Sequence, residues 1–190
     1  MKRKEDDLAR LDGVQVPLWA KILAFVISFA IAFALFYFLP RIFCNEVGYQ
    51  TPKIDTRAAI FKEDKILLVQ EKNGTWSLPG GWCDVNVSVM ENTIKEVKEE
   101  AGLDVVVKNV IAIQDREKHN QPIYAYKVCK IFMLCEVEGG VFKENSETIG
   151  FDYFTKDNLP ILATEKNNEE QIQMCFDAYK AGEKWKTYFD

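Results

Sequence analysis

The sequence predicts an α/β or α+β domain preceded by one apolar helix. Three observations support this: one long apolar run near the N-terminus, several short runs rich in Ile, Leu and Val, and two stretches with helical periodicity. A chain of 190 residues has room for one domain of ordinary size and an extension. Strands mixed with two helices form a layered sandwich. We therefore expect an N-terminal segment at 1–43, a linker at 44–53 and a folded domain at 54–190.

The apolar run, Ile22–Leu39, contains no charged residue and only one clearly polar residue, Ser28. As a helix, its 18 positions span about 27 Å, close to the ~30 Å hydrocarbon core of a bilayer. A helix that is apolar on every face lies either in lipid or in a buried interface. We expect a single transmembrane anchor at 22–39. The alternative is a helix buried in the interface of a homodimer.

Charge and cysteine content give conflicting signals about the compartment. Five basic residues precede the apolar run and two follow it, so the positive-inside rule would export the domain. The five cysteines are odd in number and lack C-x-x-C spacing, which favours a reducing compartment. We expect a single-pass membrane protein with a cytoplasmic domain, and the alternative is a soluble cytoplasmic protein. The net charge of −5 argues against nucleic acid as a partner.

The strands are predicted from short runs of aliphatic residues after the linker. Two of these runs flank Glu63-Asp64 and suggest a hairpin, and Pro79-Gly80-Gly81 ends a third. The predicted strands are Ile54–Lys62, Lys65–Glu71, Thr75–Leu78, Val105–Gln114, Ile123–Val137 and Phe151–Phe154.

Two helices are predicted, one after the third strand and one after the last. The first begins near Ser88, which has the spacing of a capping box with Glu91, and stops at Gly102. The second covers Asn168–Ala181. The residues expected to face the core are Met90, Ile94, Val97 and Ala101 in the first helix and Ile172, Cys175, Phe176 and Tyr179 in the second.

Three glutamates of the first helix point to the chemistry. Glu96, Glu99 and Glu100 stand at i, i+3 and i+4, so they project from one side of the helix. Like charges at this spacing destabilise a helix unless a cation lies among them, and Mg²⁺ (or Mn²⁺) prefers carboxylate oxygen. The alternative is a solvated acidic face. The turn at Gly80-Gly81 favours the metal site, because glycine lets the backbone approach a metal or a phosphate closely.

Residues 81–103 resemble the Nudix box, G-x5-E-x7-R-E-U-x-E-E-x-G-U, in which U is aliphatic. Gly81 and the stretch Lys95-Glu96-Val97-Lys98-Glu99-Glu100-Ala101-Gly102-Leu103 stand at matching spacing. Val87 replaces a glutamate and Lys95 replaces an arginine, two positions that help to hold the loop and helix together in the family. Asp84, in the same loop, is a candidate to compensate for this change.

The resemblance covers about residues 44–181 and includes Gly48–Lys53, Arg57–Phe61 and Trp76–Trp82. These segments resemble a Nudix branch with an N-terminal helical extension, which includes ADP-ribose and CDP-choline pyrophosphatases. The resemblance implies an α/β/α sandwich around a mixed sheet. It also implies a metal-dependent hydrolase that cleaves the pyrophosphate bond of a nucleoside diphosphate linked to another group, of the ADP-ribose, CDP-choline or nucleotide-sugar type. The alternatives are a non-catalytic nucleotide-binding sensor and a membrane-anchored interaction module.

The resemblance also implies roles for the residues of the box and of its neighbourhood. The metal ligands would be Glu96, Glu99, Glu100 and the carbonyl of Gly80, with Glu99 alternatively orienting the attacking water. The catalytic residues would be Glu99, Glu100 and, as a base from a later loop, Glu147, while Lys95 and Gly102 would support the motif. The alternative for Glu147 is an ordinary surface carboxylate.

Three further residues are candidates for substrate binding. The backbone of Gly81 is free to approach a phosphate. Arg57 is a candidate to pair with a substrate phosphate, and the alternative is that it balances Asp55. Trp82 is a candidate to stack on a base, and the alternative is a place in the core.

Overall fold

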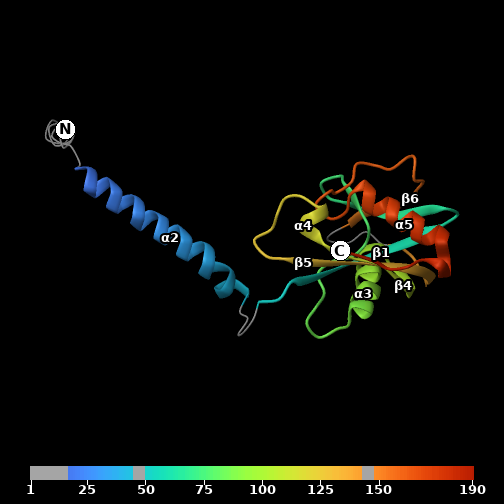
Figure 1. The fold of residues 1–190 in the computed structure, drawn as a ribbon. Coiled ribbons are helices and arrows are strands. Elements are labelled where there is room, and N and C mark those ends of the chain that lie inside the picture. Colours follow the sequence, from blue (N-terminus) through green and yellow to red (C-terminus); the bar gives the residue numbers. More distant parts are fainter. Residues whose placement is uncertain (1–16, 45–49, 143–147) are drawn as a thin grey trace, which may run out of the picture. The chain divides into compact units, whose positions relative to one another are not determined.

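The computed structural model describes residues 17–44, 50–142 and 148–190. The chain divides into two compact units, Met1–Gln50 and Thr51–Asp190, and each is considered by itself (Figure 1). The boundary between the units lies inside the segment 44–53 that the sequence analysis assigns to a linker.

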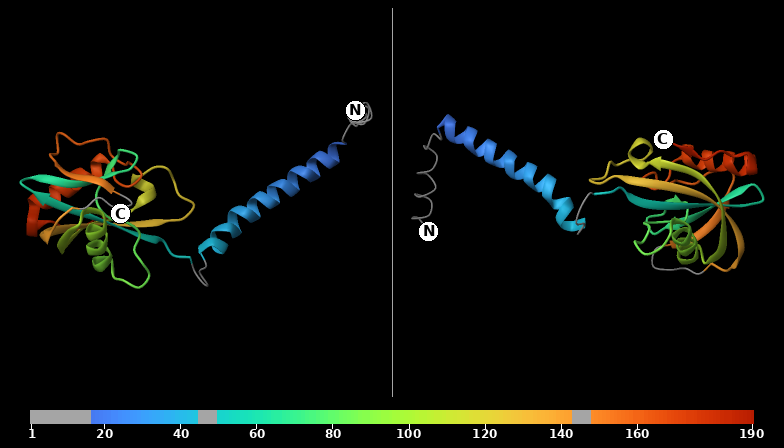
Figure 2. Two further views of the ribbon diagram at one scale, coloured as in Figure 1. Left: turned by 180° about the vertical axis from the view of Figure 1, so that it is seen from behind. Right: turned by 60° about the horizontal axis from the view of Figure 1, so that its bottom comes forward.

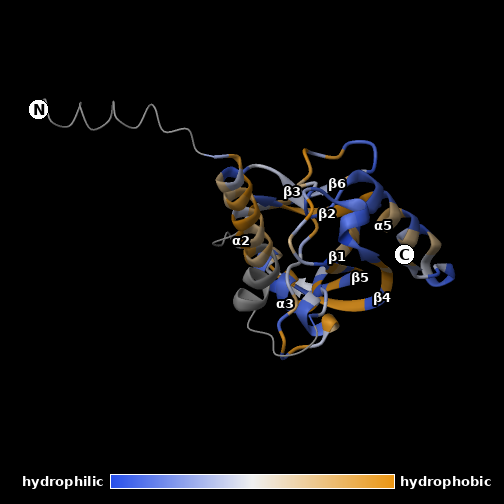
Figure 3. Ribbon diagram, turned by 60° about the vertical axis from the view of Figure 1, so that its left-hand side comes forward, coloured by the Kyte–Doolittle hydropathy of each residue, from blue (hydrophilic) through white to orange (hydrophobic). Residues whose placement is uncertain are grey.

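The described part of the first unit contains the helix α2 (Leu18–Cys44). Its side chains from Lys21 to Leu35 are all exposed, and most of the helix is hydrophobic (Figure 3). The segment Leu18–Leu35 has a mean hydropathy of 2.3 and is long enough to cross a membrane. A signal sequence near an N-terminus can have the same length and composition. The helix is longer than the expected 22–39 and continues past Pro40, because one missing backbone hydrogen bond weakens a helix locally without having to end it.

The second unit begins with the expected hairpin of β1 (Lys53–Lys62) and β2 (Lys65–Glu71). Its turn residues Glu63 and Asp64 have φ of 52° and 58°, the positive values that a two-residue hairpin turn of type I′ requires. The two strands pair only next to the turn, at Phe61–Ile66 and Lys62–Lys65. Farther from the turn, β1 keeps β5 on one edge, and β2 leaves its other edge unpaired.

A mixed sheet forms around this hairpin. The strand β5 (Val128–Gly140) pairs in parallel with β1 and antiparallel with β4 (Leu103–Asp115). The strand β2 pairs antiparallel with β3 (Trp76–Ser77) and with β6 (Thr148–Phe154). A short β7 (Tyr188–Phe189) is added in parallel to β4. The resulting order is β3-β2-β1-β5-β4-β7, with β6 also on β2.

Two helices cover opposite faces of the sheet, α3 (Val89–Ala101) and α5 (Glu169–Ala181), as Figures 1 and 2 show. Because side chains alternate along a strand, Ala58 packs in the cluster on the α3 side and Ala59 in the cluster on the α5 side. Val97 of α3 and Phe176 of α5 are almost fully buried in their respective clusters. The arrangement confirms the expected α/β/α sandwich.

The local signals at the ends of the helices are also confirmed. Ser88 caps α3 in a capping box with Glu91, and Gly102 ends the helix in the left-handed conformation with φ of 70°. Asn168 caps α5 in the same way. Local hydrogen bonds determine these ends, so a short stretch of sequence is sufficient to locate them.

Three expectations differ from the structure. Met90 is 50% exposed, because the buried face of α3 is rotated toward Asn92 and Thr93. Residues 123–127 are not in a strand, and β5 begins at Val128, after a loop with a cis peptide bond at Pro122. The segment expected to be a polar loop forms the short helix α4 (Arg116–His119), capped by the Asp115 side chain.

Replacing Ser88 with alanine should lower the stability of the second unit, because the Ser88 hydroxyl accepts the Glu91 amide at 3.2 Å. Loss of an N-cap costs about 1 kcal/mol, which corresponds to roughly 2–4 °C in Tm for a chain of this size. Thermal unfolding of the full chain in detergent measures the change. The variant Ser88→Asp is the matched control, because aspartate is an equally good N-cap. An equal loss of stability in both variants would contradict the role of the cap.

Candidate active site

The turn that precedes α3 occupies the free edge of β1. The Thr56 amide donates to the Gly81 carbonyl at 2.9 Å, and the Ala58 amide donates to the Pro79 carbonyl at 2.8 Å. In the other direction, the Cys83 amide donates to the Ile54 carbonyl at 2.9 Å. Residues 79–83 are therefore held along β1 like an additional strand, on the edge that β2 leaves open.

Two glycines make this close approach possible. Gly80 has φ of 143°, and a Cβ atom there would lie 1.9 Å from the Thr56 carbonyl oxygen. A Cβ atom on Gly81 would lie 2.5 Å from Oε2 of Glu96. Both distances are far below van der Waals contact, so a side chain at either position would displace β1 or the glutamate. Glycine at these positions allows the turn to lie against both β1 and α3.

Glu100 is directed into the domain against this turn. Its side chain is buried, and Oε2 accepts the Gly80 amide at 2.9 Å. Its own carbonyl accepts the Thr148 hydroxyl at 2.7 Å, which connects the end of α3 to the start of β6. Burial raises the pKa of Glu100 to about 7, against the opposing effects of the Arg57 charge and the Gly80 amide. The carboxylate therefore lies where an additional positive charge would stabilise its ionised form.

Glu96 and Glu99 lie closer to solvent on the same helix. Burial raises the pKa of Glu96, and the nearby charge of Glu99 adds to that effect. The Lys95 ammonium lies 3.5 Å from a carboxylate oxygen of each. The three glutamates thus differ in depth: Glu100 is buried, Glu96 is partly buried and Glu99 is exposed.

The loop before α3 is braced where the Nudix box is altered. Lys95 donates to Asp84 at 3.1 Å, and this hydrogen bond is the main reason that the pKa of Lys95 is raised. The buried Asn92 adds a second connection, because it accepts the Asp84 amide at 3.3 Å and donates to the Thr56 hydroxyl at 3.0 Å. Lys95 and Asn92 thus connect α3 to the side chain and to the backbone of Asp84, without a glutamate at Val87.

The donor set fits a divalent cation. Glu96, Glu99 and Glu100 offer hard carboxylate oxygens within one turn of helix, and the burial of Glu96 and Glu100 favours compensation by a cation. In the described ranges 17–44, 50–142 and 148–190, no three His, Cys, Asp or Glu side chains already converge as a metal site. Lys95 and the Gly80 amide instead hold the carboxylates in this structure.

Arg57 lies behind the turn. Its side chain is buried, is paired with Asp55 at 2.8 and 3.1 Å, and donates to the Leu78 carbonyl at 3.2 Å. The guanidinium therefore balances Asp55 and supports the chain immediately before Pro79. Such a group determines where the turn lies.

Two tryptophans of the region have different environments. Trp82 is 45% exposed, and its ring is 6.0 Å from that of Tyr126 in an edge-to-face arrangement. Trp76 packs edge-to-face on Phe154 at 4.9 Å, against the cluster on the α5 side. Trp82 therefore remains a candidate to stack on a ligand, and Trp76 contributes to the core.

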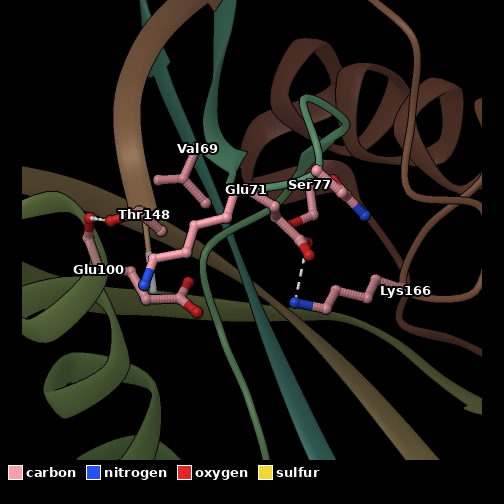
Figure 4. A pocket seen from close by; sticks show the side chains of 8 residues that line it. Val69, Glu71, Ser77, Glu100, Thr148 and Lys166 are labelled. Carbon is pink, nitrogen blue, oxygen red and sulfur yellow. Dashed lines mark hydrogen bonds and ion pairs between the residues drawn. The ribbon is translucent and has the colours of Figure 1, made fainter. Parts of the chain in front are cut away.

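A pocket of about 400 Å³ opens beside Glu100 (Figure 4). Glu100 is the one residue in its described lining that the sequence analysis assigns to the site, and Glu147 lies outside the described residues. The pocket is lined by Val69, Glu71, Lys72, Asn73, Ser77, Glu100, Thr148 and Lys166.

Sequence reasoning missed Glu71, Ser77 and Lys166 in this pocket. They come from β2, β3 and the loop before α5, and no spacing in the sequence connects them. Glu71 is the last residue of β2, and Lys166 lies in the loop before α5.

The chain is similar in sequence to several known proteins. The chain is 42% identical over 147 residues to YjhB of Bacillus subtilis, which is provisionally named an ADP-ribose pyrophosphatase; the match covers 77% of this chain and 70% of that protein. It is 32% identical over 141 residues to an ADP-ribose pyrophosphatase of Methanocaldococcus jannaschii, covering 70% of this chain and 78% of that protein.

A solved structure is similar as well. The crystal structure of an ADP-ribose pyrophosphatase from Streptococcus suis has 56% sequence identity and a TM-score of 0.69, covering 74% of this chain and all of that one. The family model of the NUDIX domain matches residues 51–175, more than half of the chain. The chain therefore belongs to the Nudix family.

Proposed function

We propose that this chain hydrolyses the pyrophosphate bond of a nucleoside diphosphate linked to a second group, with ADP-ribose as the first candidate substrate. The observation that carries the proposal is the seating of Glu100 against the Gly80 amide, with Glu96 beside Gly81. Three relatives that are named ADP-ribose pyrophosphatases support the choice of substrate. The products would be a nucleoside monophosphate and the phosphorylated second group.

Nudix hydrolases generally use divalent metal ions, and we propose Mg²⁺ or Mn²⁺ here. When bound, the ion neutralises charge on the diphosphate and lowers the pKa of a bound water. Glu96, Glu100 and the carbonyl of Gly80 would hold the ion, and Glu99 would be a further ligand or would orient the water. The Gly80-Gly81 turn leaves no side chain between the helix and the diphosphate.

The remaining site residues position these groups. Arg57 supports the turn from behind through the Leu78 carbonyl, and Lys95 and Asp84 brace the loop. Gly102 ends α3 directly after Glu100 and Ala101, and a Cβ atom there would lie 2.4 Å from the Val141 carbonyl oxygen. Trp82, half exposed beside Tyr126, offers an aromatic surface on which a base can stack.

We further propose that α2 anchors the domain to a membrane. Apart from Lys21 and Ser28, the residues from Lys21 to Leu35 are all apolar, and their side chains are exposed on the helix. Lipid is a suitable environment for a helix that is apolar on every face. The domain would then act at a membrane surface, on the cytoplasmic side where nucleotide substrates and free thiols are expected.

Replacing Glu100 with glutamine should lower kcat/KM by at least about 10²-fold, because the neutral amide removes a charged metal ligand. The shape of the side chain and its acceptor for the Gly80 amide are retained, so the fold should be kept. The measurement is turnover with Mg²⁺ on a panel of ADP-ribose, CDP-choline and nucleotide sugars.

The matched control is Glu183→Gln, which removes one exposed carboxylate outside the site. It should leave turnover unchanged. Wild-type activity in Glu100→Gln would refute the metal-site proposal. Tight binding of one panel member without turnover by the wild-type chain would instead favour a nucleotide sensor.

The full chain should remain with membranes after washes with high salt and alkaline carbonate, and detergent should release it. Placing two charges in the helix, Ile27→Lys with Ala30→Glu, should move it into the soluble fraction, because charges near the bilayer centre are unfavourable. Fractionation followed by immunoblotting measures the distribution. A wild-type chain that is recovered as a soluble dimer would contradict the anchor and support a helix buried between two copies.

A further inference from the structure

Buried side chains hold the backbone of the loop before α5 by hydrogen bonds. Three consecutive carbonyls, those of Thr164, Glu165 and Lys166, each accept a hydrogen bond from a buried side chain. Asn120 donates to the first at 2.8 Å, Arg116 to the second at 3.1 Å, and the Lys130 ammonium to the third. The backbone of the loop is thus held at three successive residues.

The donors of these bonds are costly to bury. Arg116, Asn120 and Lys130 are each no more than 2% exposed. Buried cations require compensation, and Lys130 finds only part of it from Asp55 at 3.7 Å and Asn120 at 3.3 Å. Burial therefore lowers the pKa of Lys130 to about 7. Solvent could satisfy the carbonyls of an ordinary surface loop, so this arrangement serves to place the loop accurately.

The loop is also tied to the turn of the active site. The Leu78 amide, two residues before Gly80, donates to the Asn167 side chain at 2.8 Å. Asn167 is fully buried, and its backbone amide donates to the Ala163 carbonyl at 2.9 Å. Because Gly80 contacts Glu100, these bonds fix Lys166 relative to the proposed metal ligand.

The side chain that this loop presents is a lysine in the pocket. The Lys166 ammonium lies 2.8 Å from Oε1 of Glu71, and the same oxygen accepts the Ser77 hydroxyl at 2.9 Å. Figure 4 shows this group on one side of the pocket and Glu100 on the other. The Lys166 side chain is 33% exposed, so a ligand can reach it.

We propose that Lys166 binds a phosphate of the substrate diphosphate and that Glu71 holds the ammonium in place until the substrate arrives. The inference rests on the proposed function. A cation held at Glu100 and the Lys166 ammonium would lie on opposite sides of the 400 Å³ pocket, so each would pair with one charged group of a diphosphate. Lysine suits this role because it is a compact point charge with three donors.

Replacing Lys166 with glutamine should weaken the binding of inorganic pyrophosphate at least about tenfold, the effect of losing one charge-assisted hydrogen bond. The measurement is isothermal titration calorimetry of the full chain in detergent with pyrophosphate and Mg²⁺. The variant Lys166→Arg should keep most of the affinity, because it retains the charge. The exposed Lys180→Gln on α5 is the control for net charge and should bind like the wild-type chain.

The variant Glu71→Gln distinguishes a phosphate ligand from a structural ion pair. If Glu71 competes with phosphate for the ammonium, Glu71→Gln should bind pyrophosphate at least as tightly as the wild-type chain. If the pair only supports the fold, both variants should lose affinity and Tm together, which would overturn the proposal. Wild-type affinity in Lys166→Gln, or no pyrophosphate binding by the wild-type chain, would also overturn it.

Turnover separates this proposal from the proposed function. A chain that binds pyrophosphate through Lys166 but hydrolyses no member of the substrate panel would support the phosphate site and contradict the hydrolase. A chain that hydrolyses ADP-ribose with unchanged KM and kcat in Lys166→Gln would support the hydrolase and contradict the phosphate site.

Discussion

The hydrogen bond from the Gly80 amide to the Glu100 carboxylate joins the glycine turn to the helix α3. It holds the C-terminal turn of α3 against the segment 79–83, which is itself bonded to the edge of β1. This contact requires an open edge on β1, a turn without side chains and a buried carboxylate. The edge is open because β1 and β2 pair only next to their hairpin turn. The turn has no side chains because it consists of Gly80 and Gly81. Because Glu100 is buried, its ionised carboxylate is stabilised when a cation binds beside it.

A polar layer under the turn maintains this geometry. Asp55 and Arg57 alternate with Thr56 and Ala58 on β1, so the charged side chains lie on the α5 side and the small ones on the α3 side. Arg57 supports the turn through Leu78, and Lys130 supports the loop that carries Lys166. Burying such groups opposes stability, which indicates that accurate placement of the turn and the loop is what they contribute.

The sequence predicted the features that depend on neighbours in the chain. The hairpin at Glu63-Asp64, the capping box of Ser88 and the end of α3 at Gly102 follow from local hydrogen bonds and φ angles. The buried face of α3 was less predictable, because Asn92 is buried by its bonds to Thr56 and Asp84 and not by hydrophobicity. Glu71 and Lys166 were missed because only the tertiary fold brings the loop before α5 beside the end of β2. For Arg57, the alternative that it balances Asp55 describes its contact in the structure, whereas its bond to the Leu78 carbonyl depends on the fold.

We expect the carboxylates around the Gly80-Gly81 turn to form a metal site for diphosphate hydrolysis. Anomalous diffraction from crystals of the protein grown with Mn²⁺ tests it most directly, because manganese is located independently of any assumption about the site. If these carboxylates hold the metal, an anomalous peak lies within bonding distance of Glu96 and Glu100, and Glu100→Gln removes it. A peak elsewhere on the domain, or one that survives this substitution unchanged, would contradict it.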